Sequence, residues 1–409
     1  MSLDDDWHYL PTRTRAGALQ RGLGRGAVRA GQDPAAPELI YACIRRDHRW
    51  LPLDDRGVYL ARLVRDLDLP VGPIVARLFT ATDETGEFTH VLRVAEALAR
   101  SGSEPMVESL RRYVQIGHYW REALTAIAAG GRRWPTASLP TASLPTASLP
   151  TRPVSLETPA NWWDDLLTVA ADRLACSGRP LHLPPGPPWG DWAARDERIQ
   201  AAVAHGPEPL RGLGELLSAA DLYDDDPADA DSEPCLAEPA ADSLASARRA
   251  VEDPASGGYW RGLCVLAEHG DESDGPALLA GIDWLDKRAD DMCGYDRLVD
   301  GLARVGGDAA RQALPKIRSL WFSPHSYERA AYLRARLALE PDACAGALTE
   351  GLWDCEADVR LISVRQVPLD AKLERRLEYL RDDPIELPDV RAAAAERLAL
   401  EAMFQVSPG

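Results

Sequence analysis

The sequence predicts an all-α fold, an α-solenoid of stacked antiparallel helix pairs. Apolar residues recur at helical spacing through most of the 409-residue chain. A similar segment returns at a near-constant interval toward the C-terminus, and no alternating pattern long enough for a strand is present. A single amphipathic helix pair cannot bury its own apolar face. Stacking of neighbouring pairs buries a continuous core, which is why such periods indicate a solenoid.

The repeat is carried by one arginine in each copy. Three segments align, SPHSYERAAYLRARLAL, DCEADVRLISVRQVPL and IELPDVRAAAAERLAL, and their arginines stand at 329, 360 and 391, two equal intervals. Arg297 precedes Arg329 by one residue more than this regular interval. Two identical Tyr-Trp-Arg triplets continue the pattern upstream. The predicted structural repeat residues are Arg121, Arg261, Arg297, Arg329, Arg360 and Arg391.

Each copy has two parts. The arginine opens one amphipathic helix, and a second precedes it across a short polar or Pro-containing turn, as in AARQALPKIRSLW, ACAGALTEGLW and LDAKLERRLEYLRDD. Two helices of about 12 residues and their turn account for a unit of about 31 residues. The intervening turns are expected to face solvent.

The second aligned segment resembles the HEAT-repeat family, in its short bacterial form of the bilin-lyase type. Asp354, Val359 and Arg360 in DCEADVRLIS match the D-x-x-x-x-V-R pattern of that family, and Val390 and Arg391 keep part of it. The resemblance covers 251–402 and, less closely, 54–130. It implies that the Asp and Arg hold turns and link adjacent repeats, and it carries over no catalytic residue.

These patterns divide the chain into five segments. Residues 1–130 are expected to form N-terminal HEAT-like repeats, and 251–402 the C-terminal repeats. Between them we expect a Pro/Ser/Thr-rich linker or loop (131–160) and then residues 161–250, which are either degenerate repeats with Pro-rich and acidic loops or a small helical subdomain. Residues 403–409 form a tail.

The linker holds three identical copies of PTASL. Packed repeats diverge in sequence, so an unchanged triplet indicates a recent expansion where length is tolerated, because lengthening a loop costs little. We expect deletion of residues 136–145 to leave the melting temperature and partner binding almost unchanged. Calorimetry and a binding assay on the deleted chain check this, and a large loss in either contradicts it.

The composition of the chain limits the kinds of partner and site that it can have. The net charge of −18 disfavours nucleic acid as a partner, since neutralising phosphates requires a concentrated basic patch. The seven cysteines include no C-x-x-C pair, which argues against a zinc module or a disulfide framework. The N-terminus carries no secretory pattern, and no apolar run reaches the ~20 residues of a membrane span. A cytoplasmic protein is the expectation.

No established catalytic motif occurs: a G-x-S-x-G elbow, a P-loop and H-E-x-x-H are all absent. GLGRGAVRAG (22–31) lacks the spacing of a dinucleotide turn and is expected to be a glycine-rich helix or an inter-helix turn. EHGDESDGP (268–276) does not follow the calcium-loop pattern and is expected to be a solvated turn. We therefore expect no catalytic residue, no cofactor and no metal.

Two groups of residues are candidates for partner binding. Trp162, Trp163, Trp189 and Trp192 border the Pro-rich loops, where aromatic side chains either form a recognition surface or anchor the loops. Arg21, Arg25 and Arg29 stand four residues apart, so a helix would present them on one face. They would contact an anion or a partner there, or form a solvated stripe.

The function expected from these features is that of a non-enzymatic scaffold or adaptor that binds another protein. Because the chain is acidic, a basic partner is favoured, as for an immunity protein that neutralises a toxin. The alternative is a HEAT-like DNA glycosylase, since GHYWREALTAIA resembles a helix of that group. The negative charge and the lack of a dense Lys/Arg channel speak against it. The sequence leaves the oligomeric state open.

Overall fold

The computed structural model describes residues 9–49, 54–82, 86–120, 122–123, 241–288 and 293–406. These residues form α-helices and short 3-10 helices, and no strand occurs among them. The predicted all-α class is therefore confirmed. The linker at 131–160 and nearly all of the segment at 161–250 lie outside the described residues.

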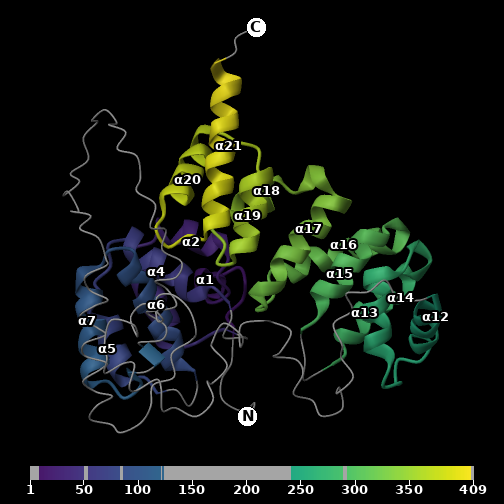
Figure 1. Ribbon diagram of the computed structural model, residues 1–409, viewed down its shortest axis with the longest axis horizontal. Helices are drawn as coiled ribbons and strands as arrows, with labels where there is room; N and C mark the ends of the chain where they lie inside the picture. Colours follow the sequence, from purple (N-terminus) through teal and green to yellow (C-terminus); the bar gives the residue numbers. More distant parts are fainter. Residues whose placement is uncertain are drawn as a thin grey trace, which may run out of the picture.

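The N-terminal helices gather around one apolar core (Figure 1). Within it, α4 packs on α6, and α6 packs on α5 and α7. Phe88 stacks on Tyr113 with ring centroids 5.3 Å apart, and both side chains are buried. The helices are α1 (Arg15–Gln20), α2 (Gly24–Ala30), α3 (Ala36–Arg45), α4 (Arg56–Asp66), α5 (Gly72–Thr80), α6 (Glu87–Arg100) and α7 (Glu104–Ile116).

The C-terminal helices follow one another in pairs. They are α12 (Ala241–Ala250), α13 (Tyr259–His269), α14 (Gly275–Leu285), α15 (Tyr295–Val305), α16 (Gly307–Leu320), α17 (Arg329–Leu339), α18 (Ala345–Gly351), α19 (Ala357–Gln366), α20 (Ala371–Asp382) and α21 (Pro388–Val406). Short 3-10 helices precede three of them: η1 (Glu272–Asp274), η2 (Ser326–Glu328) and η3 (Pro341–Ala343). The helices expected before the repeat arginines correspond to α16, α18 and α20.

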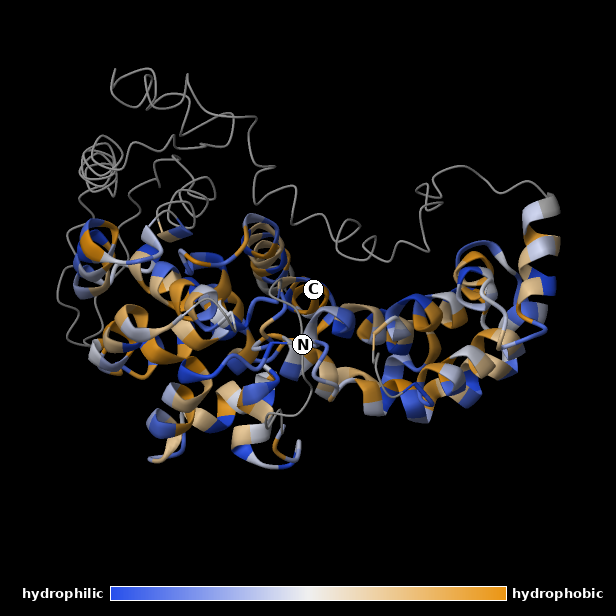
Figure 2. Ribbon diagram, turned by 90° about the horizontal axis from the view of Figure 1, so that it is seen from below, coloured by the Kyte–Doolittle hydropathy of each residue, from blue (hydrophilic) through white to orange (hydrophobic). Residues whose placement is uncertain are grey.

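Alternate helices contact one another along the C-terminal part. The odd-numbered helices form a continuous row, with α13 against α15, α15 against α17, α17 against α19 and α19 against α21. Each also packs on the even-numbered helix that precedes it in the chain. Among the even-numbered helices, α14 and α16 are the one pair of neighbours in substantial contact. Figure 2 shows that this part of the molecule bends into an arc.

Local sequence explains where these helices begin and end. Gly294 precedes α15 and Gly306 follows it, with φ of 94° and 72°, a backbone region that favours glycine. Asp370 caps α20, because its side chain accepts hydrogen bonds from the amides of Lys372 and Leu373 at 2.9 and 2.8 Å. Pro315 lies inside α16 on the solvent side without ending the helix.

The N-terminal helices pack against the last helices of the C-terminal part. Cys355 and Ile385 belong to the apolar core of the N-terminal helices, and Ala18 and Leu23 belong to that of the C-terminal helices. The amide of Cys355 donates to the carbonyl of Gly22 at 2.9 Å. Figure 1 shows α1, α2 and α4 lying beside α18–α21. We call this contact region the junction.

The junction depends on one close backbone approach. A Cβ atom on Gly24 would collide with the backbone carbonyl of Glu350. We expect Gly24→Ala to lower the free energy of unfolding by about 1–3 kcal/mol, as overpacking does. Gly346→Ala is the matched control, because Gly346 lies in α18 with no atom near its would-be Cβ, and alanine favours a helix. Urea unfolding of both variants checks this; equal stability would show that the junction is loosely packed.

Candidate functional site

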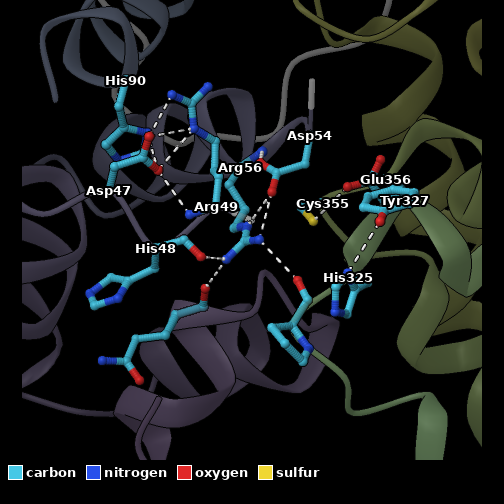
Figure 3. Close-up of polar contacts among 12 residues, drawn as sticks. Asp47, His48, Arg49, Asp54, Arg56, His90, His325, Tyr327, Cys355 and Glu356 are labelled. Atoms are coloured by element: carbon cyan, nitrogen blue, oxygen red, sulfur yellow. Dashed lines mark hydrogen bonds and ion pairs between the residues drawn. The ribbon is translucent and has the colours of Figure 1, made fainter. Parts of the chain in front are cut away.

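Arg56, the first residue of α4, is the centre of a buried polar network at the junction (Figure 3). Its guanidinium donates to the Asp54 carboxylate at 2.7 Å, and both residues are almost fully buried. It also donates to three backbone carbonyls, those of Gln20 at 2.6 Å, Pro324 at 3.0 Å and His48. Pro324 belongs to the C-terminal part, so the Arg56 side chain connects the N-terminal helices with the C-terminal part.

The charge of Arg56 needs these partners. Burial alone would lower the pKa of Arg56, but Asp54, Tyr9 and Cys355 together outweigh burial and raise it, so the guanidinium stays ionised. A cation at a helix N-terminus also opposes the helix dipole. Asp54 and the three carbonyls offset both costs, and the position suits arginine because five N–H groups can serve several acceptors at once.

A second network crosses the junction nearby. Arg62 of α4 donates to Asp383 at 2.7 Å and to Glu386 at 2.9 Å, and Arg360 of α19 donates to the same Glu386 at 2.7 Å. Arg65 donates to Asp383 at 2.7 Å. Although burial works in the opposite direction, the arginines lower the pKa of Asp383 to about 2. Arg360 and Arg62 also lower the pKa of Glu386 against the effect of burial. Both carboxylates are therefore ionised at neutral pH and hold α4 to the loop between α20 and α21.

The histidines beside Arg56 are neutral at physiological pH. Burial lowers the pKa of both His48 and His90 to about 4. The Nε2 atom of His90 lies 3.0 Å from the Cys43 carbonyl oxygen, so this nitrogen carries the proton and donates it. With Nε2 protonated, a neutral His90 ring contributes no charge to the network.

A thiol and an imidazole meet near the start of α17. The Sγ atom of Cys293 lies 3.3 Å from Nδ1 of His325, and the Tyr327 hydroxyl donates to this sulfur at 2.9 Å. A nucleophilic cysteine needs such a neighbour. Here, however, Cys293 is 7% exposed and His325 is 1% exposed, so the pair is enclosed within the folded protein.

The thiols of Cys43 and Cys355 are protonated. Burial raises the pKa of the Cys43 thiol to about 12 and that of Cys355 well above its ordinary value. Because the thiolate is the reactive form, neither residue supports nucleophilic chemistry. Instead, Cys355 accepts a hydrogen bond from Arg329 at 3.0 Å.

The carboxyl groups of Glu328, which is buried, and Glu356, which is half-buried, hold protons near neutral pH. Burial, with the neighbouring Asp296, raises the pKa of Glu328 to about 8. The Glu328 carboxyl accepts hydrogen bonds from the Gly294 amide at 2.7 Å and from the Tyr332 hydroxyl. Burial, with Asp54 and Asp55, similarly raises the pKa of Glu356 to about 7.

The shift of Glu328 predicts a pH dependence of stability. Between its ordinary pKa and about 8, the folded protein keeps a proton that the unfolded chain releases. The free energy of unfolding should therefore fall as pH rises through this window, by about 1 kcal/mol per pH unit from this group. Glu328→Gln imitates the protonated form and should lack this contribution. Urea unfolding at pH 6 and 8 measures it, with the exposed Glu272→Gln as control; parallel pH profiles for wild type and Glu328→Gln would contradict it.

The three N-terminal arginines do not share a helix face. Gly22, at φ 65°, ends α1 before α2 begins, so Arg21 caps one helix while Arg25 and Arg29 lie in the next. Arg21 is buried and donates to the carbonyls of Leu10 and Gly17. Arg25 pairs with Glu350 at 2.6 Å across the junction. Arg29 alone is exposed.

The repeat arginines fall into two groups. Arg329 donates to Asp354 at 2.9 Å and Arg360 donates to Glu386, each reaching from its helix to the turn before the next odd-numbered helix. Arg391 is half-buried and donates to the Arg381 carbonyl at 3.0 Å. Arg261 and Arg297 are exposed. Arg121 lies outside the described residues, as do Trp162, Trp163, Trp189 and Trp192.

A difference of one residue in helical position separates these groups. Counted from Ser326, where η2 leads directly into α17, Arg329 is the fourth helical residue, as Arg360 and Arg391 are in their own helices. Arg261 and Arg297 are third in theirs. One position turns a side chain by about 100°, which directs these two toward solvent.

Comparison of the chain with protein-family models, with curated proteins and with solved structures finds no match. Within the described residues, no group of three or more His, Cys, Asp or Glu side chains is placed to hold a metal ion. No helix in the same part of the chain is long and apolar enough to cross a membrane. The geometry of the helices and the junction is thus the basis for any functional assignment.

The junction residues were not predicted from the sequence. Arg56, Arg62, Asp383 and Glu386 follow no motif, and the ion pairs of Arg62 join residues more than three hundred positions apart in the chain. One signal was present: Arg62 stands among the buried residues Leu60, Ala61, Leu63 and Val64, where an arginine requires a buried acid.

Proposed function

We propose that this chain is a HEAT-like α-solenoid that acts as a non-enzymatic scaffold or adaptor and binds a protein along one face of its C-terminal helices. The observation that carries the proposal is the continuous row of contacts from α13 through α15, α17 and α19 to α21. Stacked helix pairs of this kind provide an extended curved surface, which suits the binding of a protein or a peptide.

The contacts also indicate which face is the inner one. In a bent double layer, helices on the inside of the bend lie closer together than those on the outside. The odd-numbered helices touch their neighbours throughout, whereas among the even-numbered ones only α14 and α16 do so to a similar extent. We therefore take the solvent-facing side of α13, α15, α17 and α19 as the inner face.

The inner face has a recurring composition. On α13 its exposed positions include Arg261 and Glu268, and on α19 Asp358 and Arg365, each pair seven residues apart and thus on one helix side. Half-buried apolar side chains lie between them, Val265 on α13 and Leu361 and Ile362 on α19. Apolar side chains within a charged rim are the usual anatomy of a protein interface.

The charge of the chain supports a basic partner. A net charge of −18 attracts a cationic protein over long distances and speeds the encounter. An immunity protein that neutralises a basic toxin is one adaptor of this type. Complex formation should then slow as ionic strength rises, because salt screens the attraction.

Two measurements test the proposal. The full-length chain, immobilised and incubated with an extract of its native cells, should retain one basic protein in a stoichiometric complex, with an association rate that falls with salt. Retention of no protein across growth conditions would argue against the proposal. Binding of duplex DNA at low salt with release of alkylated bases would favour the glycosylase alternative instead.

A further inference from the structure

Three arginines surround a hollow in the surface of the N-terminal helices. The hollow has a volume of about 400 Å³ and is lined by Arg13, Arg15, Arg29 and Gln32. Arg15 is the first residue of α1 and Arg13 lies just before this helix, while Arg29 is in the last turn of α2 and Gln32 lies just after it. The short turn around Gly22 reverses the chain and brings these two helix ends together.

The hollow concentrates positive charge in an acidic protein. Arg15 pairs with Asp33, whereas neither Arg13 nor Arg29 forms an ion pair with any residue in the part of the chain that the structure describes. Arg13 and Arg29 are exposed and available to a ligand, and Arg15 is also exposed but shares its guanidinium with Asp33. Like charges gathered around one hollow repel one another unless an anion binds between them.

We propose that Arg13, Arg15 and Arg29 bind a compact multivalent phosphate, such as a pyrophosphate group. A guanidinium presents planar, paired N–H donors that match the oxygen atoms of phosphate, and charge-assisted bonds of this type are the strongest hydrogen bonds in proteins. Gln32 adds an amide donor at the edge of the hollow. The described residues of the lining present guanidinium and amide groups, which suit the anionic group of a ligand.

This site is independent of the proposed protein-binding face. It belongs to α1 and α2, whereas the inner face belongs to α13–α19. Of the three arginines that the sequence singled out, only Arg29 contributes, because Arg21 and Arg25 are occupied by contacts within the chain.

Titration calorimetry with sodium pyrophosphate at low ionic strength tests the site on the full chain. We expect one bound pyrophosphate per chain and at least about tenfold weaker binding for Arg13→Gln and for Arg29→Gln, the loss expected for one charge-assisted hydrogen bond. Arg311→Gln is the control, since Arg311 is exposed on α16 and distant in the chain. Circular dichroism confirms that each variant keeps its helices.

Three outcomes would overturn the inference. They are no binding by the wild type, equal weakening in all three variants, and binding of a hexa-aspartate peptide with no binding of pyrophosphate. The last result would show that the hollow recognises carboxylates of a polypeptide and not phosphate. By contrast, the phosphate site would be supported by a pyrophosphate binding constant that falls with added salt in the wild type, but less steeply in Arg29→Gln.

Discussion

Replacing Glu386 with alanine should lower the free energy of unfolding by about 3–5 kcal/mol, because it leaves buried cations without their carboxylate. Glu386 accepts hydrogen bonds from Arg360 at 2.7 Å and from Arg62 at 2.9 Å. Asp383 still neutralises Arg62 in the variant, so Arg360 loses most. A lone buried charge is far more costly than the loss of an exposed ion pair.

Asp382→Ala is the matched control for this prediction. Asp382 lies four residues before Glu386 and is exposed, and it pairs with Arg381 at 2.6 Å on the surface. Its replacement should change the free energy of unfolding by less than about 1 kcal/mol. Urea unfolding followed by circular dichroism measures both variants. Similar losses in the two would show that the Arg62–Glu386–Arg360 network is open to water.

Replacing Arg56 with alanine should lower the free energy of unfolding by a similar amount, about 3–5 kcal/mol. The variant leaves the Asp54 carboxylate buried without its partner, and the carbonyls of Gln20, His48 and Pro324 lose a donor. Because Arg56 donates to the Pro324 carbonyl across the junction, the substitution should destabilise the junction more than the rest of the protein.

Hydrogen exchange separates this effect from a general loss of stability. In Arg56→Ala, amides of α1, α2 and α4 should exchange faster, while those of α13 and α15 should keep their protection, because these helices lie in a separate apolar core. Arg45→Ala, an exposed change at the end of α3, is the control. Uniform acceleration along the whole chain would contradict a local role for Arg56.

Local pattern was sufficient to predict the helices. The 3.6-residue period identified those around Arg329, Arg360 and Arg391, and the helix expected over AARQALPKIRSLW is present as α16. The spacing of the arginines also indicates which of them are buried. Arg297 precedes Arg329 by one residue more than the regular interval, and the structure shows Arg297 exposed where Arg329 is buried.

The junction could not be predicted from local pattern. Its ion pairs join α4 to residues near 383–386, and a helix's own periodicity does not specify which distant acid will face it. The single helix expected for Arg21, Arg25 and Arg29 was wrong for a local reason. Gly22 adopts a left-handed conformation, which ends a helix and which glycine favours over other residues.

If a protein binds the inner face formed by α13, α15, α17 and α19, charge reversals on this face should weaken the complex more than reversals elsewhere. Two triple variants with the same change in net charge test this. The inner set is Glu268→Lys, Asp300→Lys and Asp358→Lys, and the outer set, on α14, α16 and α20, is Asp283→Lys, Asp308→Lys and Glu378→Lys.

The measurement is the affinity of each triple variant for the protein recovered with the wild-type chain. We predict that the inner set weakens binding at least about tenfold, equivalent to about 1.4 kcal/mol, while the outer set leaves it within about twofold. Equal affinities for both sets, or a loss confined to the outer set, would contradict binding at the inner face.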